Sequence, residues 1–156
     1  MDLGCWPGGW LQVAAAAVGS GGRVVGVDRS EIEPALENAN VVALTADLAD
    51  PSTAEQILGL MAGPADVLLS DAAPKLTGVR DRDRAMEEEL LMAVSELVGP
   101  LLKPGGSLLV KILQGPEAQR IERDLRRRFA SAKQVKVTAT RKGSSERYLL
   151  ARGFKG

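Results

Sequence analysis

The sequence predicts one α/β domain over residues 1–156 with a mostly parallel sheet, and three observations support this fold class. A glycine-rich turn at residues 4–9 joins an apolar start to a helix, as in nucleotide-binding α/β domains. Short apolar runs then alternate with amphipathic segments, which is the pattern of repeated βαβ units. With 156 residues, of which 45% are hydrophobic, the chain can bury a core without disulfides or metal ions.

In the first half of the chain, apolar runs indicate the strands and helices, and turn residues separate them. Only three residues, Met1 to Leu3, precede the turn, so the first strand is short. The run Arg23–Asp28 is apolar and ends in an acid, which is typical of a buried parallel strand. The other predicted elements are a helix at 11–18, a strand at 41–44, a helix from a cap at Ser52 to about Met61, and a strand at 67–69.

The second half predicts two helices and three strands. Apolar residues recur at three- and four-residue spacing from about Arg82 to Leu102, so one stripe of a long helix faces the sheet. That stripe consists of Met86, Leu90, Val94, Leu97 and Leu101, and Pro104-Gly105-Gly106 ends the helix. There follow a strand at 107–110, an arginine-rich helix with Ile121, Leu125 and Phe129 on its inner face, and a hairpin of strands at 134–138 and 147–151.

The composition removes several classes of site. The chain has no histidine, which excludes Ser-His-Asp catalysis, the usual zinc ligand and the usual general base. Cys5 is the single cysteine, so we expect a structural thiol, no metal site and a reducing compartment. No apolar run approaches the roughly 20 residues of a membrane span, and no secretory signal follows Met1. We therefore expect a cytoplasmic protein without membrane contact, and a monomer.

A net charge of zero hides two oppositely charged halves. Residues 1–102 carry 6 basic and 16 acidic side chains, a net charge of −10, and residues 103–156 carry 14 basic and 4 acidic ones, a net charge of +10. Such asymmetry points to a polyanionic partner for the basic half. The arginines of residues 120–128 could simply solvate a surface helix. Their clustering with Lys133, Lys136, Arg141, Lys142 and Arg147 favours nucleic acid.

The glycine spacing favours a cofactor without a pyrophosphate. A dinucleotide fingerprint reads G-x-G-x-x-G, whereas this turn has Gly4 and then Gly8-Gly9. The wider spacing and the acidic neighbours suit S-adenosylmethionine, whose sulfonium is positively charged. Asp28, at the end of its strand, can accept hydrogen bonds from ribose hydroxyls in either kind of site. Trp10 either contacts the cofactor or packs the helix against the sheet.

Four motifs occur in order between residue 2 and about residue 153. They are Asp2-Leu3-Gly4-x-x-Pro7-Gly8-Gly9-Trp10, Ser70-Asp71-x-Ala73-Pro74, Val110-Lys111-x-x-Gln114-Gly115 and Ser144-Ser145-Glu146-Arg147-Tyr148. Together they resemble the FtsJ/RrmJ (RlmE) family of ribosomal RNA 2'-O-methyltransferases. The resemblance implies a Rossmann-like sheet of seven strands, the last antiparallel, with helices on both faces. It implies S-adenosyl-L-methionine as cofactor and methylation of a uridine ribose in the 23S RNA of the large ribosomal subunit.

The resemblance also assigns residues to roles. It implies that Gly8, Trp10, Asp28, Asp47 and Asp71 line the cofactor site, next to Gly4 of the turn. The family's catalytic set is a Lys-Asp-Lys-Glu tetrad, of which Asp71, Lys111 and Glu146 match. The first lysine of the tetrad precedes the glycine-rich turn in the family, so we expect an N-terminally short chain. Cys5-Trp6 replaces a usual small pair, and Lys75 stands where asparagine is common.

The three matched residues are predicted to meet. Asp71 and Lys111 follow strands that should be neighbours, and Glu146 begins an antiparallel strand, so all three reach the carboxyl edge of the sheet. Lys111 could take the proton of a 2'-hydroxyl or stabilise the alkoxide, with both acids orienting its ammonium and raising its pKa. On the residues alone, a lysine that extends into solvent from a strand end is the favoured interpretation of Lys111, and Glu146 could equally be a surface residue.

Basic residues in the loops at this edge are the predicted RNA contacts, and they are Lys75, Arg80, Arg82, Arg84, Arg141 and Lys142. Because aromatic residues are few, we expect recognition mainly through RNA shape and backbone. The partner is large-subunit ribosomal RNA, free or within an assembled subunit. Two alternatives stay open: a truncated or degenerate module that binds cofactor and RNA with weak or no catalysis, and an NAD-dependent enzyme.

Overall fold

The computed structural model describes residues 1–112, 115–138 and 145–156, which form a seven-stranded sheet with the strand order β3-β2-β1-β4-β5-β7-β6. The elements are β1 (Asp2–Leu3), α1 (Gly9–Val18), β2 (Val24–Asp28), β3 (Val41–Thr45), α2 (Thr53–Met61), β4 (Ala65–Ser70), α3 (Arg80–Leu101), β5 (Leu102–Lys111), α4 (Pro116–Arg127), β6 (Phe129–Thr138) and β7 (Ser145–Phe154).

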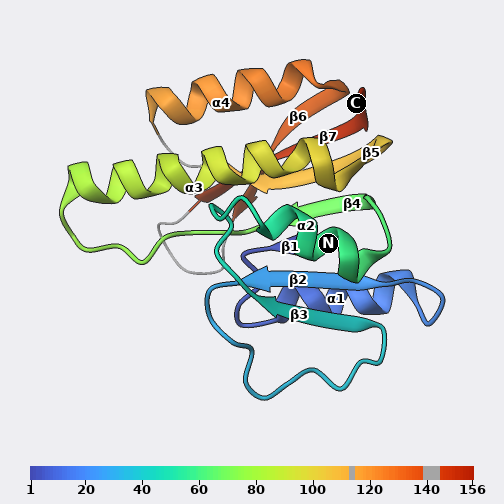
Figure 1. The fold of residues 1–156 in the computed structure, drawn as a ribbon. Coiled ribbons are helices and arrows are strands. Elements are labelled where there is room, and N and C mark those ends of the chain that lie inside the picture. Colours follow the sequence, from blue (N-terminus) through green and yellow to red (C-terminus); the bar gives the residue numbers. More distant parts are fainter. Residues whose placement is uncertain (113–114, 139–144) are drawn as a thin grey trace.

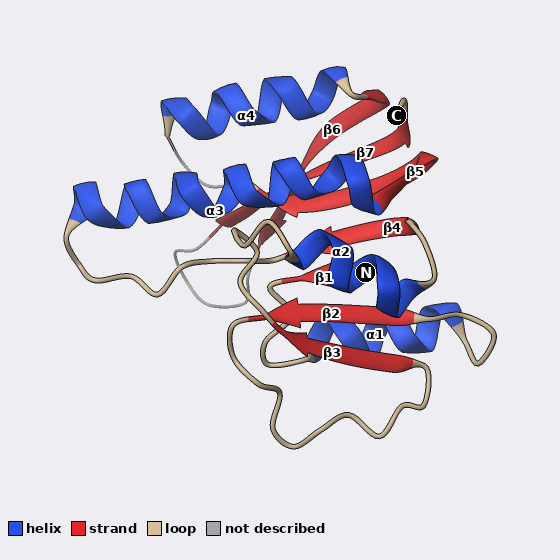
Figure 2. Ribbon diagram, viewed as in Figure 1, coloured by secondary structure: helices blue, strands red, loops and turns tan. Residues whose placement is uncertain are grey.

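The predicted fold class is confirmed. Strands β1 to β5 pair in parallel, and β7 runs antiparallel to both of its neighbours, β5 and β6. Helix α1 lies on one face of the sheet, and α2, α3 and α4 lie on the other (Figures 1 and 2). This arrangement is the doubly wound architecture in which parallel strands are covered on both sides.

The apolar runs form the strands that they predicted, although several boundaries moved. Val24, Val25 and Val27 of β2 are almost fully buried, as expected of a central parallel strand. Strand β5 starts at Leu102, so the Pro104-Gly105-Gly106 segment lies inside its bounds instead of in a separate turn. The hairpin strands β6 and β7 are each 10 residues long, because pairing continues to Phe129 and Phe154.

Two helix predictions need correction. Ser52 occupies the N-cap of α2 but makes no side-chain cap; its hydroxyl donates to Asp50 Oδ1 at 2.8 Å instead. In the stripe of α3, Val94, Leu97 and Leu101 are buried, whereas Met86 and Leu90 are only half-buried. The reason is visible in Figure 1, where the N-terminal part of α3 extends past the ends of the strands.

The sheet register brings one set of loops together. Leu3 of β1 pairs with Ser70 of β4, and Ser70 pairs with Val110 of β5, so the parallel strands end at a common edge. Lys111 pairs with Tyr148 near the start of β7. The loops after β1, β2 and β4 and the beginning of β7 therefore share this carboxyl edge. No helix within the described ranges has both the length and the apolarity needed to cross a membrane.

Candidate active site

Three predicted residues form one cluster at the carboxyl edge. The Nζ of Lys111 lies 2.8 Å from Asp71 Oδ1 and 3.1 Å from Glu146 Oε1. The lysine side chain is 14% exposed, whereas the two carboxylates are 32% and 43% exposed, so the ammonium lies deeper than its partners. The structure therefore brings together the three residues that match the tetrad. Their catalytic role remains a prediction.

Tyr148 is a fourth member of this cluster that the sequence prediction missed. Its hydroxyl lies 2.7 Å from Asp71 Oδ1 and 3.2 Å from Glu146 Oε2. Because a phenol has one proton, it donates chiefly to the nearer oxygen, that of Asp71. The ring is buried and its centroid is 5.8 Å from that of Trp10 on α1. The spacing from Glu146 was a usable signal, because residues two apart on a strand share a face.

The cluster holds Lys111 in its charged form. Burial favours the neutral amine, but the hydrogen bonds and charges of Asp71 and then Glu146 outweigh it, so the pKa of Lys111 lies above its ordinary value. Burial, followed by the same two carboxylates, also raises the pKa of Tyr148. At neutral pH the cluster thus contains an ammonium and a protonated phenol between two acids.

The glycine-rich turn packs directly on the loop that carries Asp71. Gly4 has φ +81, and a Cβ at this position would lie 2.6 Å from the Cβ of Ala72. Gly8, at the N-cap of α1, has φ +104 and is buried. Only glycine fits these conformations at this distance. Trp10 follows on α1, half-buried against Tyr148, so both interpretations of this residue keep their support.

Asp28, the last residue of β2, and Asp47, which follows β3, differ in how many further hydrogen bonds they can accept. Asp28 accepts the backbone N–H groups of Trp6 (3.1 Å) and Ser30 (2.8 Å), which fix its carboxylate at the edge. Asp47 accepts the N–H of Ala49 and, at 2.6 Å, the Arg29 guanidinium; these bonds hold the pKa of Asp47 below its ordinary value. The ion pair with Arg29 was not predicted, because the two residues belong to different loops.

Asp2 is the unexpected residue of the site. It is fully buried in β1, and neither carboxylate oxygen has a hydrogen-bond partner among the described residues. Burial raises the pKa of Asp2 to about 7; the Met1 amino group opposes this shift, and the charges of Asp71 and Asp28 add to it. Asp2, Asp28 and Asp71 are therefore close enough for their charges to interact. An orphaned carboxylate in such a place suits a positively charged ligand.

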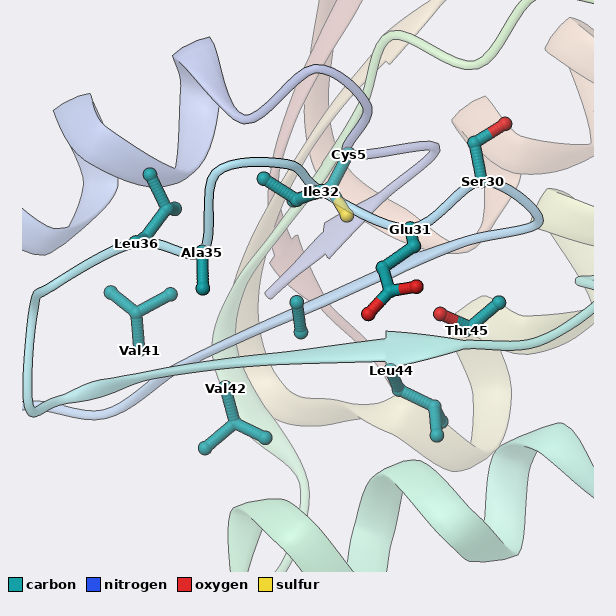
Figure 3. Close-up of a pocket in the computed structure, with 11 residues that line it drawn as sticks. Cys5, Ser30, Glu31, Ile32, Ala35, Leu36, Val41, Val42, Leu44 and Thr45 are labelled. Carbon is teal, nitrogen blue, oxygen red and sulfur yellow. The ribbon is translucent and has the colours of Figure 1, made fainter.

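A pocket of about 340 Å³ adjoins the same turn on its β3 side. Figure 3 shows the segment from Ser30 to Leu36 passing over β3, with Cys5 and Ile32 near the pocket. Its lining is mostly aliphatic, and it lies several strands away from Lys111 in the sheet order. The Cys5 thiol is buried and unpaired, and burial raises its pKa to about 12, so it is a structural and not a reactive thiol.

The predicted RNA contacts divide into three groups. Lys75, Arg80 and Arg82 are exposed on the loop after β4 and the start of α3. Arg84 is bound to Glu88 at 3.2 Å. Arg141 and Lys142 lie outside the described residues, as do Gln114 and Ser144 of the motifs.

The arginines of α4 and its C-cap mostly make contacts within the protein. Arg120, Arg126 and Arg127 pair with acids of the same helix, and Arg128 donates to the carbonyl of Ser95. These contacts favour a structural role for this helix. In the part of the chain that the structure covers, no three Cys, Asp or Glu side chains are arranged as a metal site.

The sheet order and the carboxyl-edge site define a Rossmann-like α/β protein of the methyltransferase type. A putative ribosomal RNA methyltransferase from Plasmodium falciparum matches with a TM-score of 0.80 at 22% identity, over 99% of this chain and 85% of that one. An O-methyltransferase from Bacillus cereus, solved in complex with SAH, matches with a TM-score of 0.66 at 20% identity, over 97% and 72% of the two chains. These likenesses concern the fold.

Sequence relatives define the family. Residues 1–154 match the family described as FtsJ-like methyltransferase. The chain is 40% identical over 158 residues to the ribosomal RNA large subunit methyltransferase E of Methanosphaera stadtmanae, of which it covers 76%. It is also 40% identical over 156 residues to the protein of that name from Methanothermobacter thermautotrophicus, of which it covers 74%. The chain therefore belongs to the FtsJ-like methyltransferase family, and the resemblance found in the four motifs is confirmed.

Proposed function

We propose that this protein transfers a methyl group from S-adenosyl-L-methionine to the 2'-oxygen of a uridine ribose in the 23S RNA of the large ribosomal subunit. The observation that carries the proposal is the contact of Lys111 with Asp71 and Glu146 at the edge where the glycine-rich turn ends β1. The names of the relatives support large-subunit ribosomal RNA as the substrate.

The residues present fit the cofactor. S-Adenosylmethionine carries positive charge on its sulfonium and ammonium groups, and the orphaned carboxylate of Asp2 lies with Asp28 and Asp71 under the turn. Asp28 is held by two backbone N–H groups and retains lone pairs for ribose hydroxyls. The pocket lined in part by Ser30, two residues after Asp28, would hold the adenine of the cofactor.

When bound, the cofactor supplies an electrophilic methyl group. The residues of the chain must align a ribose hydroxyl with that group, because alignment provides much of the rate in a direct displacement. For a 2'-oxygen to accept the methyl group, the hydroxyl proton would have to leave. We assign this role to Lys111, which would receive the proton or stabilise the oxygen as the proton departs.

Lys111 cannot accept a proton while it is an ammonium, which is its form between the two acids. A cation seated beside it would oppose that charge and lower its pKa toward neutrality. We therefore infer that Lys111 becomes a base only in the loaded site. Asp71 and Glu146 fix its position in either form.

The test is transfer of labelled methyl groups to large ribosomal subunits and to their deproteinised RNA. We expect the label in alkali-resistant dinucleotides, because a methylated 2'-oxygen cannot attack the neighbouring phosphate. Lys111→Ala should lower kcat by about a hundredfold or more. Lys111→Arg should also be impaired, because an arginine keeps the charge but does not deprotonate.

Lys103→Ala is the matched control, since Lys103 lies at the opposite end of β5 and pairs with the exposed Asp66. It should retain wild-type activity. Binding of the cofactor by calorimetry without any transfer by the wild type would refute the proposal and favour the degenerate binding module. Binding of NAD in its place would favour the alternative of an NAD-dependent enzyme.

A further inference from the structure

Trp6 is the exposed aromatic residue of this chain. The sequence contains five aromatic side chains, all within the described ranges. Tyr148, Phe129 and Phe154 are buried, Trp10 is half-buried, and the Trp6 side chain is 59% exposed. An exposed indole leaves a large apolar surface in water. The residues around Trp6 therefore indicate which kind of ligand could bind against it.

Trp6 lies beside the candidate active site. Its backbone N–H donates to Asp28 Oδ2 at 3.1 Å, which fixes this part of the turn at the carboxyl edge. Gly4, two residues earlier, packs on Ala72, the residue that follows Asp71. The loop that carries the indole is therefore in contact with the loop that carries a member of the Lys111 cluster.

The loop after β4 adds apolar and basic side chains to the same rim. Leu76 and Val79 are 64% and 60% exposed, and Lys75, Arg80 and Arg82 are exposed among them. The loop has a defined shape, because the Asp83 carboxylate accepts both the N–H and the hydroxyl of Thr77. An aromatic face on one loop and basic side chains on the loop that it contacts make the combination that binds unpaired nucleic acid.

We propose that the indole of Trp6 is a stacking platform for an unpaired base of the RNA substrate at the mouth of the active site. The inference rests on the proposed function. It adds that the RNA beside Trp6 is single-stranded. The scarcity of aromatic residues still limits stacking to this one position, so shape and backbone contacts provide the remaining recognition. Ring planes stack on any base, which makes the contact tolerant of sequence.

The test compares Trp6→Ala, Trp6→Phe and Trp6→Leu with the wild type. The probes are a short unpaired RNA, a duplex of the same composition and S-adenosylmethionine alone. Trp6→Ala should weaken binding of the unpaired RNA about tenfold and raise KM for RNA similarly, with the affinity for the cofactor unchanged. Trp6→Phe should restore most of the affinity. Trp6→Leu should not, because it keeps apolar bulk without a ring face.

Val13→Ala is the matched control, because Val13 is a 71% exposed apolar residue on α1. It should change neither affinity. Unchanged binding of unpaired RNA by Trp6→Ala, or an equal loss on the duplex, would overturn the stacking inference while leaving the methyltransferase proposal intact. A loss confined to cofactor binding would also overturn it, by showing that the indole covers the cofactor. A wild-type protein that binds neither RNA would overturn both proposals.

Discussion

The hydroxyl of Tyr148 donates to Asp71, one of the two carboxylates that hold Lys111 in place. This hydrogen bond disperses part of the negative charge that Asp71 presents to Lys111. Removing the hydroxyl leaves more negative charge beside the ammonium. The pKa of Lys111, already above its ordinary value, should then rise further.

Tyr148→Phe should therefore shift the acidic limb of the pH–kcat profile to higher pH. The sign follows from the requirement for neutral Lys111, because activity rises as the pH passes through its pKa in the loaded enzyme. The ring of phenylalanine keeps the contact with Trp10, so the affinity for the cofactor should change little. A profile that only decreases in height, without moving along the pH axis, would assign Tyr148 a packing role.

The burial of Asp2 leads us to predict an unusual dependence of the protein's stability on pH. Its carboxyl has a pKa of about 7 in the folded protein and an ordinary value of 3.8. Between these values the folded state holds a proton that the unfolded state has lost, so the free energy of unfolding falls as the pH rises from about 4 to 7. Above pH 7, the ionised carboxylate of Asp2 lowers the free energy of unfolding by its full amount, which is on the order of 4 kcal/mol.

Asp2→Asn removes this titration. Urea unfolding from pH 4 to 8 should show the variant gaining stability relative to the wild type as the pH rises, with the difference constant above about pH 7. The comparison between the two proteins cancels those titrating groups on which the charge of Asp2 does not act. Parallel pH dependences of the two proteins would contradict a raised pKa for Asp2.

At the scale of elements, the strands and helices could be predicted because each has its own periodic apolar pattern. The meeting of Lys111, Asp71 and Glu146 was predictable too, because parallel strands end at one edge and an antiparallel strand begins there. The pairing of Arg29 with Asp47 and the burial of Asp2 were not. They depend on loop conformation and on packing between strands distant in sequence, which no local pattern encodes.

The contact of the turn after β1 with the loop after β4 gives a prediction at this scale. Gly4→Ala combines a strained φ of +81 with a Cβ 2.6 Å from that of Ala72, whereas Gly19→Ala has φ +67 and no atom within 4 Å of the new Cβ. The control should cost about 1 kcal/mol of stability from backbone strain alone. Gly4→Ala should cost more, and it should also lower cofactor affinity, since the loops must separate. Equal stability losses would mean that the two loops do not pack as closely as described.

For the whole molecule, the division of charge along the sequence becomes a division in space. Residues up to Leu102 form β3, β2, β1 and β4 with α1 to α3, and the later residues form β5, β7 and β6 with α4. The boundary between the acidic and the basic half therefore runs between β4 and β5, where Asp71 meets Lys111. The proposed cationic cofactor would lie in the acidic field, and the proposed RNA would lie along the boundary, where Lys75, Arg80 and Arg82 of the first half add to the basic side chains of the second.

This arrangement predicts that salt affects the two ligands differently. RNA affinity should fall steeply with ionic strength, because basic side chains displace counterions from phosphates, whereas cofactor affinity should change little. Lys136→Gln, on β6 in the basic half, should reduce the slope of log K against log salt by about 0.7 to 0.9 if this lysine contacts a phosphate. Arg23→Gln, just before β2 in the acidic half, should leave the slope unchanged. Fluorescence anisotropy of labelled RNA at several salt concentrations measures both slopes, and equal reductions for the two variants would contradict this placement of the RNA.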